Sequence, residues 1–127
     1  MRKILFFLAL LTMVVLSCKE EKPAEIRLCS DIRPANPCIG EDSVFIQGKN
    51  VWAQLWLGRN FDDTAVIANL YGYQDGQRIF IESIEHEIDQ GQEVVMESLF
   101  FNNKGKFEVE FRGSKGNLLD KKGFEIW

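Results

Sequence analysis

Histidine, cysteine and proline are scarce in this 127-residue chain, which has one His, three Cys and three Pro. Nucleophilic triads and most transition-metal sites use imidazole or thiolate groups, so the supply for either is small. The sequence also lacks a phosphate-binding P-loop, a GxGxxG segment after a strand and a GxSxG nucleophile motif. These absences disfavour catalysis. We expect a protein that is not an enzyme and that has no cofactor or resident metal.

The single histidine, His86, lies in an acidic segment, Glu85-His86-Glu87-Ile88-Asp89. On a strand, the three acidic side chains share one face and His86 points to the other. On a helix, His86 still lies about 100° away from Glu85. We therefore interpret the segment as a solvated connection and keep a metal site as the less favoured alternative. The stretch 83–92 is the one place in the domain where a short helical turn fits.

Long apolar runs are also missing, except at the N-terminus. Arg2 and Lys3 precede an apolar run from Ile4 to Leu16. As a helix this run spans roughly 20 Å, short of the ~30 Å hydrocarbon core of a bilayer. A basic start, an apolar run and a small residue before the cleavage point are typical of a secretory signal. Residues 1–17 are therefore expected to form a signal peptide with a short helix.

The apolar run closes on Val15-Leu16-Ser17-Cys18, which resembles the lipobox of bacterial lipoproteins. The resemblance implies cleavage before Cys18, a diacylglycerol on its thiol and attachment to a membrane. Residues 18–25 then form a flexible tether. The acidic stretch behind Cys18 resembles the tag that exports some Bacteroidota lipoproteins to the cell surface, and a plain solvated linker is the equal alternative. Lys19 is not the Asp that retains lipoproteins in the inner membrane, which favours the outer membrane.

Basic residues are in the minority once the signal peptide is removed. Residues 1–17 carry two of the 15 Lys and Arg and none of the 19 Asp and Glu, so the remaining chain has a net charge of −6. Nucleic acids and anionic lipid surfaces repel such a domain. We expect no nucleic-acid partner.

Two cysteines remain when Cys18 is lipidated, and we expect Cys29 and Cys38 to form a disulfide. An exported chain meets an oxidising compartment. Closing a loop of about ten residues stabilises the fold by roughly 2–3 kcal/mol. The spacing is not CxxC, so a redox or metal-binding pair is the less favoured alternative.

Apolar residues alternate with polar ones from Asp42 onward, which is the pattern of half-buried strands. Asp75-Gly76 between two such runs predicts a hairpin turn. Strands are expected over 44–47, 51–57, 65–73, 77–83, 93–101, 107–112 and 124–126. About seven short strands separated by turns predict one all-β domain over 26–127, with an antiparallel sandwich favoured over a barrel.

The last third of the chain resembles the closing strands of immunoglobulin-like domains. More narrowly, 29–127 resembles a bacterial exported immunoglobulin-like family of uncharacterised function, through Val51-Trp52-Ala53, Tyr73-Gln74-Asp75-Gly76 and Gly105 to Val109. These are turn and core residues, so the resemblance implies an immunoglobulin-like β-sandwich and no particular activity. Both cysteines precede the first Trp, unlike those of antibody domains.

The aromatic residues of two strands supply a candidate binding face. In 51–57 and 65–73, one alternate set of side chains is wholly aliphatic and is expected to face the core. If these strands are neighbours, the other set forms an outward aromatic platform with amide groups, made of Trp52, Gln54, Trp56, Asn69, Tyr71 and Tyr73. The alternative is that a bulge shifts the phase and Trp52 or Trp56 packs in the core.

The leading functional hypothesis is a non-catalytic binding or adhesion module on the bacterial envelope, with a protein or glycan as its partner. Flat aromatic rings and amide groups suit such ligands because they bury area and give direction at low entropic cost. The alternatives are a structural subunit of an envelope complex and a small envelope inhibitor of a hydrolase.

Overall fold

The computed structural model describes residues 23–32, 38–58 and 61–127, and in these ranges the chain consists of strands and loops. The predicted signal peptide, Cys18 and the first part of the tether lie outside the described residues. Within those ranges no helix is long and apolar enough to cross a bilayer. The strands are β1 (Glu25–Cys29), β2 (Asp31–Ile32), β3 (Cys38–Ile39), β4 (Val44–Phe45), β5 (Asn50–Trp56), β6 (Ala65–Gln74), β7 (Gln77–Glu87), β8 (Val94–Phe100), β9 (Gly105–Gly113) and β10 (Leu118–Ile126).

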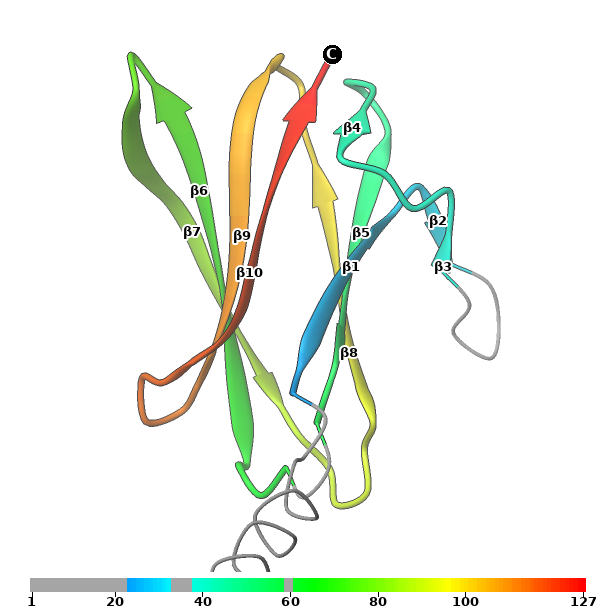
Figure 1. Cartoon of the computed structure of the whole chain (residues 1–127), viewed down its shortest axis with the longest axis vertical. Coiled ribbons are helices and arrows are strands. Elements are labelled where there is room, and N and C mark those ends of the chain that lie inside the picture. Colours follow the sequence, from blue (N-terminus) through cyan, green and yellow to red (C-terminus); the bar gives the residue numbers. More distant parts are fainter. Residues whose placement is uncertain (1–22, 33–37, 59–60) are drawn as a thin grey trace, which may run out of the picture.

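Two sheets face each other and form a sandwich (Figure 1). One sheet has three strands in the order β1-β5-β8, and the other has five in the order β4-β10-β9-β6-β7, with β2 and β3 forming a small separate pair. The pairs are antiparallel except for β10 with β4, which is parallel. Seven of the described strands have five or more residues. The predicted all-β, immunoglobulin-like sandwich is confirmed.

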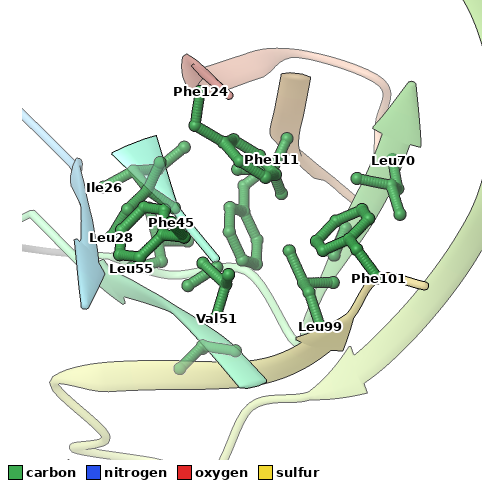
Figure 2. Close-up of a cluster of buried hydrophobic side chains, with 14 of the residues drawn as sticks. Ile26, Leu28, Phe45, Val51, Leu55, Leu70, Leu99, Phe101, Phe111 and Phe124 are labelled. Carbon is green, nitrogen blue, oxygen red and sulfur yellow. The ribbon is translucent and has the colours of Figure 1, made fainter. Parts of the chain in front are cut away.

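The core lies between the sheets and is built from the aliphatic side of each alternating strand (Figure 2). On β5, Val51, Ala53 and Leu55 are fully buried. The large buried side chains that pack with them include Ile26, Leu28, Phe45, Leu70, Leu99, Phe101, Phe111 and Phe124. The predicted phase of β5 and β6 is therefore correct. Side chains of the opposite phase lie on the outer faces of the two sheets.

The disulfide between Cys29 and Cys38 is present and joins the end of β1 to β3. The two Cα atoms are 5.5 Å apart, within the usual range for a disulfide. Because the bond closes a short loop that includes 33–37, it stabilises this side of the three-stranded sheet.

The predicted hairpin at Asp75-Gly76 joins β6 to β7. Both residues have positive φ, 52° and 78°, as a two-residue hairpin turn requires. β7 then continues as a strand to Glu87, which pairs with Ala65. The possible helical turn in 83–92 is therefore wrong over Ser83 to Glu87, because pairing with β6 outweighs local preference.

Candidate functional site

Three of the predicted platform residues lie on the outer face of the three-stranded sheet, and one of them is hidden. Gln54 is 0% exposed, whereas Trp52 and Trp56 are half-buried. The indole Nε1 of Trp56 donates to Gln54 Oε1 at 2.7 Å. Arg27 and Met96 are the cross-strand partners of Gln54. Large neighbours on all sides therefore cover this amide, and the prediction that Gln54 faces solvent is wrong.

The other three, Asn69, Tyr71 and Tyr73, lie on the outer face of the five-stranded sheet. Because β5 and β6 belong to different sheets and each buries its aliphatic phase between the sheets, the two halves of the predicted platform point away from each other. The single contiguous platform is therefore wrong. Alternation predicts the face on which a side chain lies, but it does not predict which sheet a strand joins.

Cross-strand neighbours give the three β6 residues a different setting from the one predicted. Tyr71 lies between Glu108 and Phe80, and Tyr73 lies between Lys106 and Arg78. We call this surface the tyrosine face, formed by Asn69, Tyr71, Tyr73, Arg78, Phe80, Glu108, Glu110 and Arg112. Sequence reasoning missed its charged members, because alternating Glu and Arg on 107–112 look like an ordinary solvated side of a strand.

Glu110 is the centre of the tyrosine face and is only 2% exposed. Its carboxylate accepts hydrogen bonds from Arg112 Nε at 2.8 Å, Asn69 Nδ2 at 3.1 Å and the Tyr71 hydroxyl at 3.2 Å. The hydrogen bond from Arg112 is the main reason that the pKa of Glu110 is lowered, in spite of its burial. The carboxylate is therefore held ionised and immobile.

Arg78 fixes the exposed half of the tyrosine face. Its Nη1 lies 3.0 Å from Glu108 Oε1, and its guanidinium lies 4.0 Å from the centre of the Tyr71 ring. The Tyr73 hydroxyl donates to Glu108 Oε2 at 3.1 Å. Burial first, and then the neighbouring carboxylates, raise the pKa values of both tyrosines. Both hydroxyls therefore stay protonated donors near neutral pH.

A hollow of about 350 Å³ lies next to Tyr73 on the same side of the sheet. We call it the Gly123 hollow, because Gly123 lies opposite Glu108 there and adds no side chain. The hollow is lined by Ser43, Val44, Tyr73, Lys106, Phe107, Glu108, Gly123, Phe124 and Glu125. Trp127 Nε1 donates to Glu125 Oε2 at 3.0 Å, and this Trp is 63% exposed.

A larger groove of about 980 Å³ lies at the end of the sandwich where β1 begins. Trp56 and Phe61 line it together with five acidic residues and Arg27. One of the acids, Asp63, is already engaged, because it accepts hydrogen bonds from the Ser114 amide at 2.8 Å and from the Ser114 hydroxyl. Those bonds lower the pKa of Asp63. The groove is formed by loops far apart in the sequence, which gave no signal for it.

His86 lies at the edge of the sandwich. The prediction that its segment is a solvated connection is wrong at this residue. It is half-buried on β7, and its Nε2 lies 2.7 Å from Glu97 Oε2 on β8. The pair thereby links the edges of the two sheets. Among residues 23–32, 38–58 and 61–127, no group of three or more His, Cys, Asp or Glu side chains is arranged to hold a metal ion.

A comparison with known protein families finds no match for this sequence, and neither does a comparison with curated proteins. Solved structures do match its fold. A superoxide reductase (neelaredoxin) from Ignicoccus hospitalis aligns with a TM-score of 0.51 and 12% identity, over 88% of this chain and 86% of that one. A point variant of that reductase aligns with a TM-score of 0.50 at the same identity and coverage. At 12% identity the likeness shows a shared β-sandwich fold alone. Superoxide reductase activity is a property of those proteins and is not transferred to this chain.

Proposed function

We propose that this chain is a lipid-anchored, non-catalytic binding module of a bacterial envelope, and that it binds its partner through the tyrosine face. The observation that supports the proposal is that the tyrosine face exposes aromatic and charged side chains that are already held in place. Tyr73 is 40% exposed and Phe80 56% exposed, and the side chain of Arg78 is 43% exposed. Rings and a guanidinium already held by neighbours lose little freedom on binding.

The electrostatics of the tyrosine face favour binding over catalysis. A general acid needs a raised pKa so that it can hold its proton at neutral pH. The pKa of Glu110 is shifted in the opposite direction, mainly by its hydrogen bond from Arg112. Glu108 is likewise occupied by Arg78 and Tyr73. These groups organise a surface and do not act as an acid and base pair.

The anchor is supported by the Val15-Leu16-Ser17-Cys18 pattern together with the disulfide, since disulfides form in exported proteins. The geometry suits a tether. β1 begins in the lower part of Figure 1, whereas the β6–β7 turn and the end of β10 lie at the top. A lipid at Cys18 would therefore leave Tyr73 and Arg78 at the end remote from the membrane.

Two phenylalanines allow a matched test, because Phe80 and Phe100 are both 56% exposed but lie on different sheets. A photo-crosslinking phenylalanine analogue is placed at each position in the full-length lipoprotein in cells. We expect a discrete adduct from position 80 and none from position 100. Equal adducts at both positions, or none at position 80, would overturn binding through the tyrosine face.

The anchor has its own test in the same cells. Labelling with a fatty-acid analogue should mark the wild-type chain and be lost in Cys18→Ser. Persistence of the label in Cys18→Ser, or an uncleaved and unlabelled wild-type chain, would contradict anchoring at Cys18.

One observation favours a second candidate, a structural subunit of an envelope complex. β7 ends the five-stranded sheet, and no other described strand pairs with its outer edge. It also exposes Ile79 and Ile81, at 44% and 49%. A long apolar edge strand is a template for adding a strand from another chain. A stoichiometric partner in detergent extracts would favour this function over transient binding.

A further inference from the structure

Gly123 occupies the middle of β10, where the backbone gives no reason for a glycine. Its φ is not among the positive values, and the irregularity in the β9–β10 ladder lies between Leu118 and Asp120. A Cβ atom at Gly123 would meet only the backbone oxygen of Phe107, at an ordinary 3.7 Å. Glycine inside a strand weakens it and often marks a close approach by a ligand. What the missing side chain does provide is the Gly123 hollow.

The charges around the Gly123 hollow are opposed to one another. Glu108 is held by Arg78 at 3.0 Å, and Lys106 lies opposite Glu125 in the ladder. Glu125 also accepts the indole hydrogen of Trp127. A site without an unopposed charge gives no advantage to an ionic ligand, whereas its carboxylates and ammonium group can bond hydroxyl groups of a neutral one.

Aromatic rings complete this chemistry. The hollow is bordered by Tyr73, and Trp127 is attached to its Glu125 wall. Flat rings cover the apolar face of a ligand while their polar atoms remain bonded to protein. Here the Tyr73 hydroxyl and the Trp127 indole nitrogen are both held by carboxylates, which fixes the ring positions. A ligand that matches needs an apolar face and a rim of hydroxyl groups.

We propose that the Gly123 hollow binds a neutral saccharide unit. Sugar rings combine an apolar C–H face with hydroxyl groups that both donate and accept. The volume of about 350 Å³ is at the lower end of ligand sites and fits a single sugar unit of a longer glycan. The inference rests on the proposed binding function and names its ligand class.

A single substitution at Gly123 blocks the site without disturbing the fold. Gly123→Gln places a polar side chain in the hollow, and its Cβ has room. Lys121→Gln is the control, because it introduces the same residue two positions away on the same face of β10, opposite Glu110 and outside the hollow. Circular dichroism and thermal unfolding should show that both variants fold.

The test uses the full-length lipoprotein in detergent on an array of neutral, acidic and aminated glycans, followed by titration of the best neutral glycan. We expect the wild type to bind a neutral glycan, Gly123→Gln to bind it at least about tenfold more weakly, and Lys121→Gln to stay within about twofold. Tyr73→Ala should weaken binding, whereas Tyr73→Phe, which keeps the ring, should largely retain it.

The inference is overturned if the wild type binds no neutral glycan, if it prefers charged glycans, or if Gly123→Gln binds as well as the wild type. Failure of the broader proposal has a different signature. A protein adduct at position 80 with no glycan binding would keep the binding module and reject the saccharide. Absence of both would reject both.

Discussion

The outer faces of the two sheets both carry aromatic side chains next to an amide, but the two faces differ in how much of these groups solvent can reach. On β5, Trp52 and Trp56 flank Gln54, and the amide is buried beneath them. On β6, Tyr71 and Tyr73 are held by carboxylates of the neighbouring strand β9, and Tyr73 stays exposed. The difference shows that cross-strand partners decide whether aromatic side chains close over a strand or remain available to a ligand.

The largest difference between the two faces is expected in the free energy of unfolding when the buried polar residue at the centre of each face is replaced. Glu110→Leu removes the acceptor for Arg112, Asn69 and Tyr71. We expect it to destabilise the protein by about 2–4 kcal/mol. The loss is below the range for fully buried pairs because the side chain of Arg112 is partly exposed. Gln54→Leu should cost about 1–2 kcal/mol. Urea unfolding measures both. A larger loss for Gln54→Leu would contradict the view that the tyrosine face depends on its charges.

The disulfide should affect the tryptophan side and leave the tyrosine face largely intact. Cys29 is the cross-strand neighbour of Trp52. We expect the double variant Cys29→Ser with Cys38→Ser to lose about 2–3 kcal/mol. Trp fluorescence in a Trp127→Phe background, which leaves Trp52 and Trp56 as the emitters, and the titration of the tyrosines would follow the two sides separately. A change confined to the tyrosine signal would contradict this assignment.

Acid should act on the tyrosine face through Glu110. The pKa of Glu110 is lowered in the folded state, so its contribution to stability is present above the unfolded pKa of about 4.3 and is lost as the pH falls through the lower folded value. The fall in stability below about pH 4.3 should be shallower in Glu110→Gln than in the wild type. Urea unfolding at several pH values checks this. Asp63 also has a lowered pKa, so part of the slope should remain in the variant.

The strands from β4 to β10, the core phase, the Asp75-Gly76 turn and the disulfide could all be predicted, because each depends on residues close together in the sequence. The sequence did not predict β1, β2 or β3, since the alternation of apolar and polar residues is clear only from Asp42 onward. The binding surface could be predicted only in part. Period-two alternation identifies Tyr71 and Tyr73 as outward-facing, but the partners that hold them, Glu110 and Glu108, lie 39 and 35 residues later in the chain. Assigning strands to sheets depends on long-range packing, which alternation within one strand does not encode.

The smallest expected effect distinguishes a glycine that leaves room for a ligand from a glycine that the backbone conformation requires. Gly76 has a φ of 78°, so Gly76→Ala forces a side chain into a left-handed conformation and should destabilise the protein by about 1 kcal/mol or more. Gly123 has no such constraint, and Gly123→Ala should stabilise it by roughly 0.5–1 kcal/mol. Thermal unfolding without ligand compares them. A loss of stability in Gly123→Ala would mean that the fold itself requires this glycine, and the hollow would then need no ligand to explain it.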